Sequence, residues 1–307
     1  MTDLRQALDH YLAIRRALGF KLQRVGQLLP GFVTYMEQAG AATITTELAL
    51  AWAMEPAGGA AWWRIRLRAV RGFARHLQIV DPCTQVPPAD LLPAPPSRAT
   101  PYLYSECDIG RLMTAARTFV SPLKAATYET LVGLLATTGL RVGEAIRLDR
   151  TDLDWDNGVL TVRSSKFGKS REVPLHPSTL SALRAYQLRR DQLCPRPKAP
   201  SFFISTTGTR LDQPTVGSTF VLLARQAGLR PRSLRCRPRP HDLRHSFAVR
   251  TLLNWYRAGD NVEAKLPLLS TYLGHISPAS TYWYLTAAPE LLALASKRLE
   301  HALEDLA

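Results

Sequence analysis

The stretch YETLVGLLATTGLRVGEAIRL (residues 128–148) predicts a buried helix that stops and a second helix that begins shortly afterwards. Its first half is apolar on nearly every side, which is typical of a helix inside a core. Gly139 suits the end of this helix, because glycine accepts the left-handed backbone of a C-terminal cap. Arg141 then lies where the next helix starts, and Glu144 is a polar residue in apolar surroundings. The stretch therefore predicts an α-helical core with a charged junction.

The residues that follow predict a small β-structure and then further helices. GVLTVRSSKFGKSREVPLH (residues 158–176) alternates β-branched residues on either side of a polar loop, the pattern of an antiparallel hairpin. Helical patterns resume at about 177–192, 214–227, 241–257, 263–273 and 277–285, and a C-terminal helix is expected at about 288–307. Residues 102–307 are thus predicted to form an α+β domain, mainly α with a small β-sheet.

The N-terminal part, residues 1–82, has helical periodicity throughout and predicts an all-α domain. In WWRIRLRAVRGFARHLQIV (residues 62–80), one helical stripe is apolar and a parallel stripe is basic. A basic stripe of this kind is either a solvated face or a face that follows phosphates, and the absence of acids in the run favours the second. The basic stripe consists of Arg64, Arg68, Arg71 and Arg75.

A proline-rich segment separates the two parts. DPCTQVPPADLLPAPPSRATP (residues 81–101) contains seven prolines, which remove backbone donors and disfavour helix. We therefore expect a semi-extended linker at 83–101 and a domain boundary there. Both flanking parts are net basic, so that one polyanion can contact both, as in a two-domain clamp.

The composition indicates a polyanionic partner. The chain has 307 residues, 46% of them hydrophobic, and a net charge of +14. Such an excess points to nucleic acid or an anionic membrane surface. No apolar run is long enough to span a bilayer, and the N-terminus lacks the order of a secretory signal. The scattered cysteines have no metal-binding or disulfide spacing, which indicates a cytoplasmic protein; they are Cys83, Cys107, Cys194 and Cys236.

Three further segments contain residues suited to chemistry. Lys166 and Lys169 lie in the hairpin loop, where a lysine is ordinarily solvated but can also reach a phosphate. PHDLRHSFA (240–248) and LGHISPASTYWYLT (273–286) concentrate histidine, arginine and tyrosine. His241 and His245 have the spacing of metal ligands, but Asp242 stands where a metalloprotease motif has glutamate, so we expect no metal. A phosphate-binding site built from histidine and arginine is the better interpretation.

Taken together, these segments resemble the tyrosine recombinase (phage integrase) family. The resemblance rests on TGLRVGE, HDLRHSFA and LGHISPASTYWYL in that order, with a hairpin lysine between the first two. It covers residues 102–307, while the helical N-terminal part is similar to that family's core-binding domain. The sequence resembles Xer-like and transposon-borne members, without indicating which branch.

The resemblance implies a role for each matching residue. Tyr284 would attack a DNA phosphodiester and form a 3′-phosphotyrosine, while Lys166 would protonate the leaving 5′-oxygen. Arg141 and Arg244 would bind the non-bridging phosphate oxygens, a task that suits guanidinium forks. Two histidines complete the set: His241 would assist proton transfer, and His275 would hydrogen-bond the phosphate. No metal, ATP or other cofactor is expected.

Several alternatives stay open at the level of sequence. Tyr282 is a rival nucleophile, although spacing from the LGH histidine favours Tyr284. Lys169 is a rival to Lys166, although counting back from VPL favours Lys166; it is then a candidate DNA contact. The run RQAGLRPRSLRCRPRP (225–240) either grips phosphates or forms an unusual connection, and its candidate DNA contacts are Arg235, Arg237 and Arg239.

The sequence thus predicts a site-specific recombinase or integrase that acts on double-stranded DNA in integration, excision or transposition. We expect a homo-oligomer, a tetramer on two duplexes, alone or with related recombinases, in the bacterial cytoplasm at the nucleoid. A topoisomerase with the same chemistry, or a DNA-binding protein of the same fold without activity, is the alternative. Specificity for the target sequence is expected to come from side chains that meet base edges in the DNA grooves.

Overall fold

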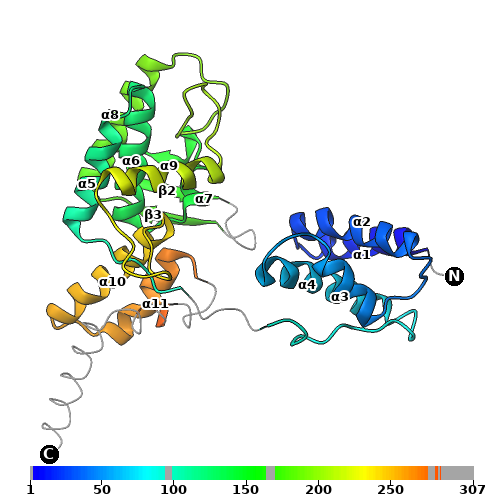
Figure 1. Ribbon diagram of the computed structural model, residues 1–307. Helices are drawn as coiled ribbons and strands as arrows, with labels where there is room; N and C mark the ends of the chain where they lie inside the picture. Colours follow the sequence, from blue (N-terminus) through cyan, green and yellow to red (C-terminus); the bar gives the residue numbers. More distant parts are fainter. Residues whose placement is uncertain (1–2, 94–98, 164–169, 276–280, 283, 285–307) are drawn as a thin grey trace, which may run out of the picture. The chain divides into compact units, whose positions relative to one another are not determined.

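The computed structural model describes residues 3–93, 99–163, 170–275, 281–282 and 284. The chain divides into two compact units, Met1–Arg98 and Ala99–Ala307 (Figure 1). Lys166, Lys169 and the C-terminal helix expected at 288–307 lie outside the described residues. Within the described part of the chain, no helix has the length and apolar character that crossing a membrane requires.

The described part of the first unit is built from helices. Side chains cap two of them, because Asp3 accepts hydrogen bonds from the amides of Arg5 and Gln6, and Thr45 accepts one from Leu48. Aromatic and aliphatic side chains of all the helices, such as Phe32 and Trp52, fill one core. The helices are α1 (Leu4–Ala17), α2 (Gln23–Gln38), α3 (Thr46–Met54) and α4 (Ala60–Leu77).

Helix α4 buries the predicted apolar stripe, and its basic stripe has a partly different task from the one expected. Arg64 donates to the carbonyl of Pro93, and Arg71 donates to the carbonyls of Pro87 and Pro88. Leu92 joins the core of the first unit. Residues 83–93, expected in an extended linker, therefore pack onto the first unit. Proline lacks an amide donor but keeps its carbonyl, and these carbonyls accept from the guanidiniums.

The second unit is mainly helical and is built around α6. Ser105 forms a capping box with Asp108 at the start of α5, and Pro122 opens α6. The bounds of the remaining helices follow the apolar periodicity of the sequence closely. The helices are α5 (Glu106–Arg117), α6 (Pro122–Thr138), α7 (Val142–Ala145), α8 (Pro177–Leu193), α9 (Gln213–Gln226), α10 (His241–Arg257) and α11 (Val262–Leu273).

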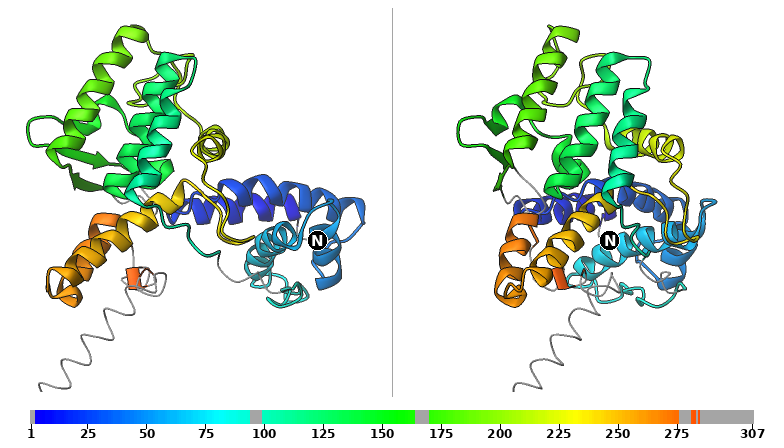
Figure 2. Two further views of the ribbon diagram at one scale, coloured as in Figure 1. Left: turned by 60° about the vertical axis from the view of Figure 1, so that its left-hand side comes forward. Right: turned by 90° about the vertical axis from the view of Figure 1, so that its left-hand side faces the viewer.

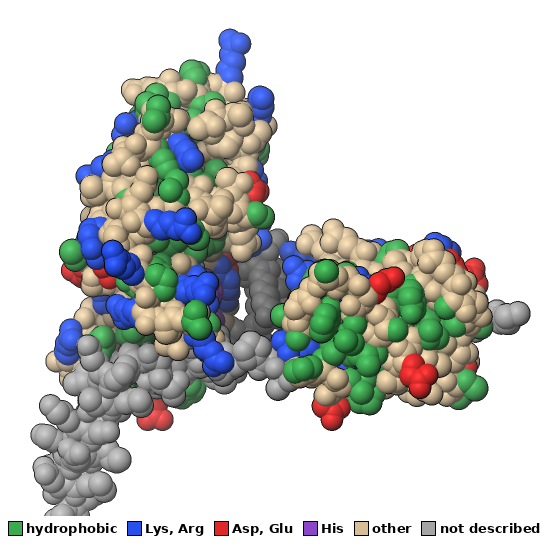
Figure 3. Space-filling view, viewed as in Figure 1, with side chains coloured by type: hydrophobic (Ala, Val, Ile, Leu, Met, Phe, Trp, Pro, Cys, Tyr) green, Lys and Arg blue, Asp and Glu red, His purple; other side chains and the backbone are tan. Residues whose placement is uncertain are grey.

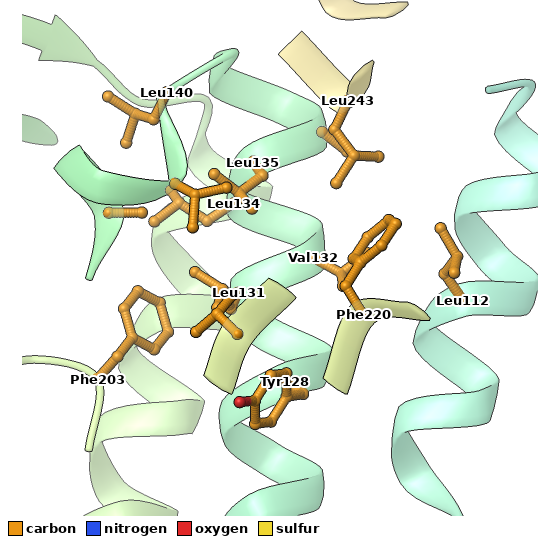
Figure 4. Packing of buried hydrophobic residues seen from close by; sticks show 14 of the residues in the cluster. Leu112, Tyr128, Leu131, Val132, Leu134, Leu135, Leu140, Phe203, Phe220 and Leu243 are labelled. Carbon is orange, nitrogen blue, oxygen red and sulfur yellow. The ribbon is translucent and has the colours of Figure 1, made fainter. Parts of the chain in front are cut away.

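Helix α6 is the centre of the core of the second unit. In Figure 4, its leucines face Phe203 on one side and Phe220 of α9 on another, while Leu112 of α5 and Leu243 of α10 close the cluster. Each fully buried leucine contributes about 1.5–3 kcal/mol relative to an exposed one. The junction after α6 is therefore held by a rigid helix.

A three-stranded antiparallel sheet lies beside the helices. It has the order β1 (Leu153–Asp154), β2 (Val159–Val162) and β3 (Arg171–Pro174). Val162 pairs with Arg171 and Leu160 with Val173, so the buried residues of both strands face the core. The predicted hairpin, and with it the α+β class of this unit, is confirmed. Helices α10 and α11 follow in the chain and run side by side in both views of Figure 2.

Candidate active site

The junction after α6 brings Arg141 to a defined place. Gly139 has φ 61° and ends α6 in the left-handed conformation. Arg141 is the N-cap of α7, and its amide donates to the Glu144 carboxylate at 3.0 Å. The turn that the sequence predicted here therefore exists. It orients an arginine and a glutamate toward each other.

Three arginines from three elements meet at the C-terminal end of α11. The carbonyls of the last residues of a helix have no partner inside the helix, and they carry the negative end of its dipole. Here each of three successive carbonyls accepts from a different guanidinium. Arg171 Nε lies 2.8 Å from the Tyr272 oxygen, Arg244 Nη2 lies 2.7 Å from the Leu273 oxygen, and Arg141 Nη2 lies 3.1 Å from the Gly274 oxygen. We call these three acceptors the α11 carbonyls.

Glu144 links two of these arginines. Its Oε1 lies 2.6 Å from Arg141 Nη1, and its Oε2 lies 2.9 Å from Arg171 Nη2. Burial alone raises the pKa of Glu144, but the hydrogen bonds and charges of Arg171 and Arg141 outweigh burial and bring that pKa to about 2. Glu144 is therefore a carboxylate at neutral pH, with one negative charge between two positive ones.

Arg244 is buried, with a side-chain exposure of about 1%. Its Nη1 donates to the Gly139 carbonyl at 2.8 Å, in addition to the Leu273 carbonyl. Burial lowers the pKa of Arg244 to about 10, although the nearby Tyr284 acts in the opposite direction. The guanidinium therefore keeps its positive charge at neutral pH inside the protein, where a charge interacts strongly with an anion.

Tyr284 lies in the core beside Arg244. It is 3% exposed and packs among residues of α10 and α11, and its hydroxyl interacts electrostatically with the Arg244 guanidinium. The Tyr284 ring is stacked on His275 at a centroid distance of 5.8 Å, and it lies 5.3 Å from the ring of His245. Tyr282, the rival tyrosine, is 49% exposed. The two tyrosines thus point in different directions.

His275 is an uncharged hydrogen-bonding group in this site. Its Nδ1 lies 2.7 Å from Thr281 Oγ1. Burial lowers the pKa of His275, and the charges of Arg244, Arg141 and Arg171 lower it further, to about 4. At neutral pH the imidazole is therefore neutral, so that one ring nitrogen can donate and the other can accept.

The low pKa of His275 predicts a pH-dependent stability. An unfolded histidine binds a proton below about 6.5, whereas the folded one does so near pH 4. Unfolding takes up a proton between these values, so the free energy of unfolding contributed by His275 falls as the pH drops from about 6.5 to about 4. Urea unfolding at pH 7 and pH 4.5 measures the fall. His275→Asn should show a smaller fall than the wild type, and an equal fall contradicts the assignment.

Gly274 provides a second stability prediction. Its φ is 68°, and a Cβ there would lie 2.7 Å from Nη1 of Arg171. Gly259 also has a positive φ, 75°, but nothing lies within 4 Å of its Cβ position. Gly259→Ala should cost about 1–2 kcal/mol through backbone conformation alone. Gly274→Ala should cost clearly more in a urea titration, because it also displaces Arg171. Equal costs would show that Arg171 moves aside freely.

His241 lies at the margin of this cluster. It is the first residue of α10, it is exposed, and its ring is 4.8 Å from that of His245. His245 is buried and lies between His241 and Tyr284. The His245 ring lies 5.3 Å from the Tyr284 ring, so His245 packs against the tyrosine. Lys166 and Lys169 lie outside the described residues, so their position is not part of this geometry.

Arg171 is the residue that sequence reasoning missed. It stands in SREVPL and reads there as an ordinary charged strand residue. Its side chain is 11% exposed, which is low for a position near the end of a hairpin. Thr281, the partner of His275, was missed as well, although it lies within the quoted segment LGHISPASTYWYL, six residues after His275. Arg171 has no local signal, because its partners Glu144 and Tyr272 are 27 and 101 residues away in the sequence.

The candidate DNA contacts have different surroundings. Arg68 and Arg75 of α4 are exposed, whereas Arg64 and Arg71 bind the proline-rich segment. In the second unit, Arg235 and Arg237 are exposed. Arg239 makes a two-pronged ion pair with the buried Asp242, 3.0 Å for each nitrogen. Arg239 therefore fixes the start of α10, a task that the sequence did not reveal.

The part of the chain that contains these residues matches a known protein family. The phage integrase family matches residues 104–290. Protein y4rB of Sinorhizobium fredii, named as an integrase/recombinase, is 48% identical over 99% of both chains. Tyrosine recombinase XerC of Azotobacter vinelandii is 32% identical over 71% of this chain and 67% of its own length. The solved Tn1549 transposon integrase has a similar fold, with a TM-score of 0.64 at 17% identity, covering 98% of this chain and 99% of that one.

These matches define the class of the protein, which is a tyrosine-type site-specific recombinase. The chain belongs to the phage integrase family. The names of its relatives do not favour a topoisomerase or an inactive DNA-binding protein.

Proposed function

We propose that this recombinase cleaves and rejoins DNA with Tyr284 as the nucleophile. The observation that carries this assignment is the buried Tyr284, whose hydroxyl interacts with the charge of Arg244 and whose ring stacks on His275. A phosphate that reaches this hydroxyl also reaches a buried guanidinium. Arg141 is the more open arginine, with 28% of its side chain exposed, and so serves as the second anion-binding group.

The reaction is a transesterification at phosphorus. The Tyr284 oxygen forms a bond to the phosphorus of a DNA phosphodiester, and the bond to the 5′-oxygen breaks, which leaves a 3′-phosphotyrosine and a free 5′-hydroxyl. A tyrosine is mostly protonated at neutral pH, so its proton must leave during attack. Positive charge stabilises the developing negative charge on both the phenol oxygen and the phosphate.

The remaining residues complete the proton transfers. His275, neutral at pH 7, donates a hydrogen bond to a non-bridging phosphate oxygen. His241 assists removal of the tyrosine proton, with His245 between it and the Tyr284 ring. Lys166 protonates the leaving 5′-oxygen; this assignment comes from the sequence. The phosphodiester energy is kept in the phosphotyrosine, so rejoining needs no ATP.

Basic residues on both units bind the DNA backbone. The net charge is +14, and the face of the second unit seen in Figure 3 carries many Lys and Arg side chains and few acidic ones. Solved relatives of similar fold include a lambda integrase tetramer bound to a Holliday junction, which supports assembly of this chain as a tetramer on two duplexes. The exposed Arg68, Arg75, Arg235 and Arg237 are the leading phosphate contacts, and Lys169 is a further one.

The domain roles follow from this division of charge. Residues 1–82 form the core-binding domain, residues 83–101 join it to the rest of the chain, and residues 102–307 form the catalytic domain. Arg64, Arg71 and Arg239 support the DNA-binding surface by fixing its backbone.

A covalent-capture selection tests the proposal and finds the target sequence in the same experiment. Purified protein is incubated with nicked duplexes that contain a randomised region, in EDTA, and the protein is recovered under denaturing conditions. Duplexes bound covalently to the protein are amplified and sequenced. We expect one enriched site and a protein–DNA adduct in EDTA. If no duplex becomes covalently attached while duplex DNA binds normally, the protein does not use a phosphotyrosine.

A further inference from the structure

Arg171 connects three elements that contribute to the site. It opens β3, where it pairs with Val162 in the sheet. Its guanidinium donates to both carboxylate oxygens of Glu144, at 3.2 and 2.9 Å, and its Nε donates to the Tyr272 carbonyl. The side chain of Arg171 is 11% exposed, whereas that of Arg141 is 28% exposed, so Arg171 is the more enclosed of the two arginines that bind Glu144.

The charge of Glu144 explains why a third arginine matters. Glu144 is almost fully buried, and a buried carboxylate needs compensating positive charge. If Arg141 were its single partner, the carboxylate would neutralise the guanidinium that an incoming phosphate needs. Arg171 makes two of the hydrogen bonds to Glu144, and Arg141 therefore retains more of its positive charge and its outward-facing donors.

Arg171 also holds the backbone at the end of α11, because it binds one of the α11 carbonyls. Arg171 holds the Tyr272 carbonyl, Arg244 holds Leu273 and Arg141 holds Gly274. His275 follows directly in the chain. An arginine missing from this set leaves one buried carbonyl without its donor, and the backbone that leads to His275 loses one of its supports.

We propose that Arg171 is a positioning residue of the site: it shares the charge of Glu144 and holds the end of α11, so that Arg141 and His275 are ready for a phosphate before DNA binds. This inference rests on the proposed phosphotyrosine chemistry, and it concerns a residue that need not touch DNA.

A double-variant experiment separates this role from a merely structural one. The single-turnover rate of covalent complex formation and the affinity for the selected duplex are measured for the wild type, Arg171→Gln, Glu144→Gln and the double variant. We expect Arg171→Gln to lower the rate on the order of 10- to 100-fold, as misplaced groups do, with affinity changed less than about 3-fold. The double variant should react faster than Arg171→Gln, because Arg141 then faces no unshared carboxylate.

Two outcomes of the double-variant experiment overturn the inference. If Arg171→Gln reacts at the wild-type rate, the residue does not position the site. If the double variant is as slow as or slower than Arg171→Gln, the role is structural. A wild type that forms no covalent complex refutes the proposed function instead. Arg189→Gln, an exposed arginine of α8, is the control for loss of one charge and should react normally.

A DNA-free measurement provides an independent readout. The charge of Arg171 is one of the causes that lower the pKa of His275. An NMR titration of carbon-13-labelled histidines should therefore show a higher pKa for His275 in Arg171→Gln than in the wild type, and no change in Arg189→Gln. An unchanged His275 pKa overturns the inference.

If Arg171→Gln does not fold, Arg171→Lys replaces it. Lysine keeps the positive charge but cannot donate to Glu144 and the Tyr272 carbonyl at the same time, so the rate should fall about 3- to 10-fold. An unchanged rate overturns the inference.

Discussion

Tyr284→Phe is expected to abolish the covalent protein–DNA complex while leaving a folded, DNA-binding protein. The hydroxyl of Tyr284 is the atom that would bond to phosphorus, and removing a nucleophile costs on the order of 10⁶-fold in rate. The ring stays the same, so its packing against His275 and His245 is retained. Loss of the polar interaction between this hydroxyl and Arg244 should cost about 1 kcal/mol of stability. A denaturing gel with the selected nicked duplex measures the complex.

Tyr282→Phe is the matched control. Tyr282 lies two residues away and its side chain is largely exposed. This variant should form the covalent complex at the wild-type rate. If the adduct survives in Tyr284→Phe and disappears in Tyr282→Phe, the nucleophile is Tyr282, and the buried tyrosine has a packing role.

Arg244→Lys is expected to have the second largest effect. The guanidinium donates to the carbonyls of Gly139 and Leu273 and also reaches Tyr284, and a lysine ammonium cannot reproduce that fork. We expect the cleavage rate to fall about 10²- to 10³-fold, the usual cost of losing one donor to a developing charge. At least one buried carbonyl loses its partner, which should destabilise the fold by about 1–3 kcal/mol.

The control for this variant comes from the same helix. Arg250 of α10 donates to the Ala136 carbonyl of α6 at 2.9 Å, away from the tyrosine. Arg250→Lys should react normally and lose less stability in urea unfolding. Comparable losses of rate in both variants would mean that the effect of Arg244 comes from the α6–α10 contact, and that the phosphate-binding role is incorrect.

Much of the fold could be read from local patterns. The end of α6 at Gly139 follows from a single residue type, and Ser105 marks the start of α5 in the same way. The hairpin follows from alternation on both sides of a polar loop. Residues 83–93 were less predictable, because a proline-rich segment looks the same whether it is extended in solvent or held by Arg64 and Arg71 on the surface of a helix.

The residues of the candidate site fall into the same two groups, those that local sequence patterns predict and those that they do not. Arg141, Arg244, His275 and Tyr284 stand out through motifs and their order, which do not depend on tertiary contacts. Arg171 has no motif of its own. Its importance appears when β3, α7 and the end of α11 are brought together, since a hydrogen bond between residues 171 and 272 is invisible to any local window.

The sequence by itself therefore determined the residue types of the proposed chemistry and the basic charge that favours DNA, because charge and helical spacing are local properties. Burial decided the rest. It turned His275 into a neutral donor with a pKa near 4, placed Tyr284 rather than Tyr282 against Arg244, and made Glu144 a shared counter-charge. These properties depend on the dielectric surroundings and on partners far along the chain, which exist after folding and not before.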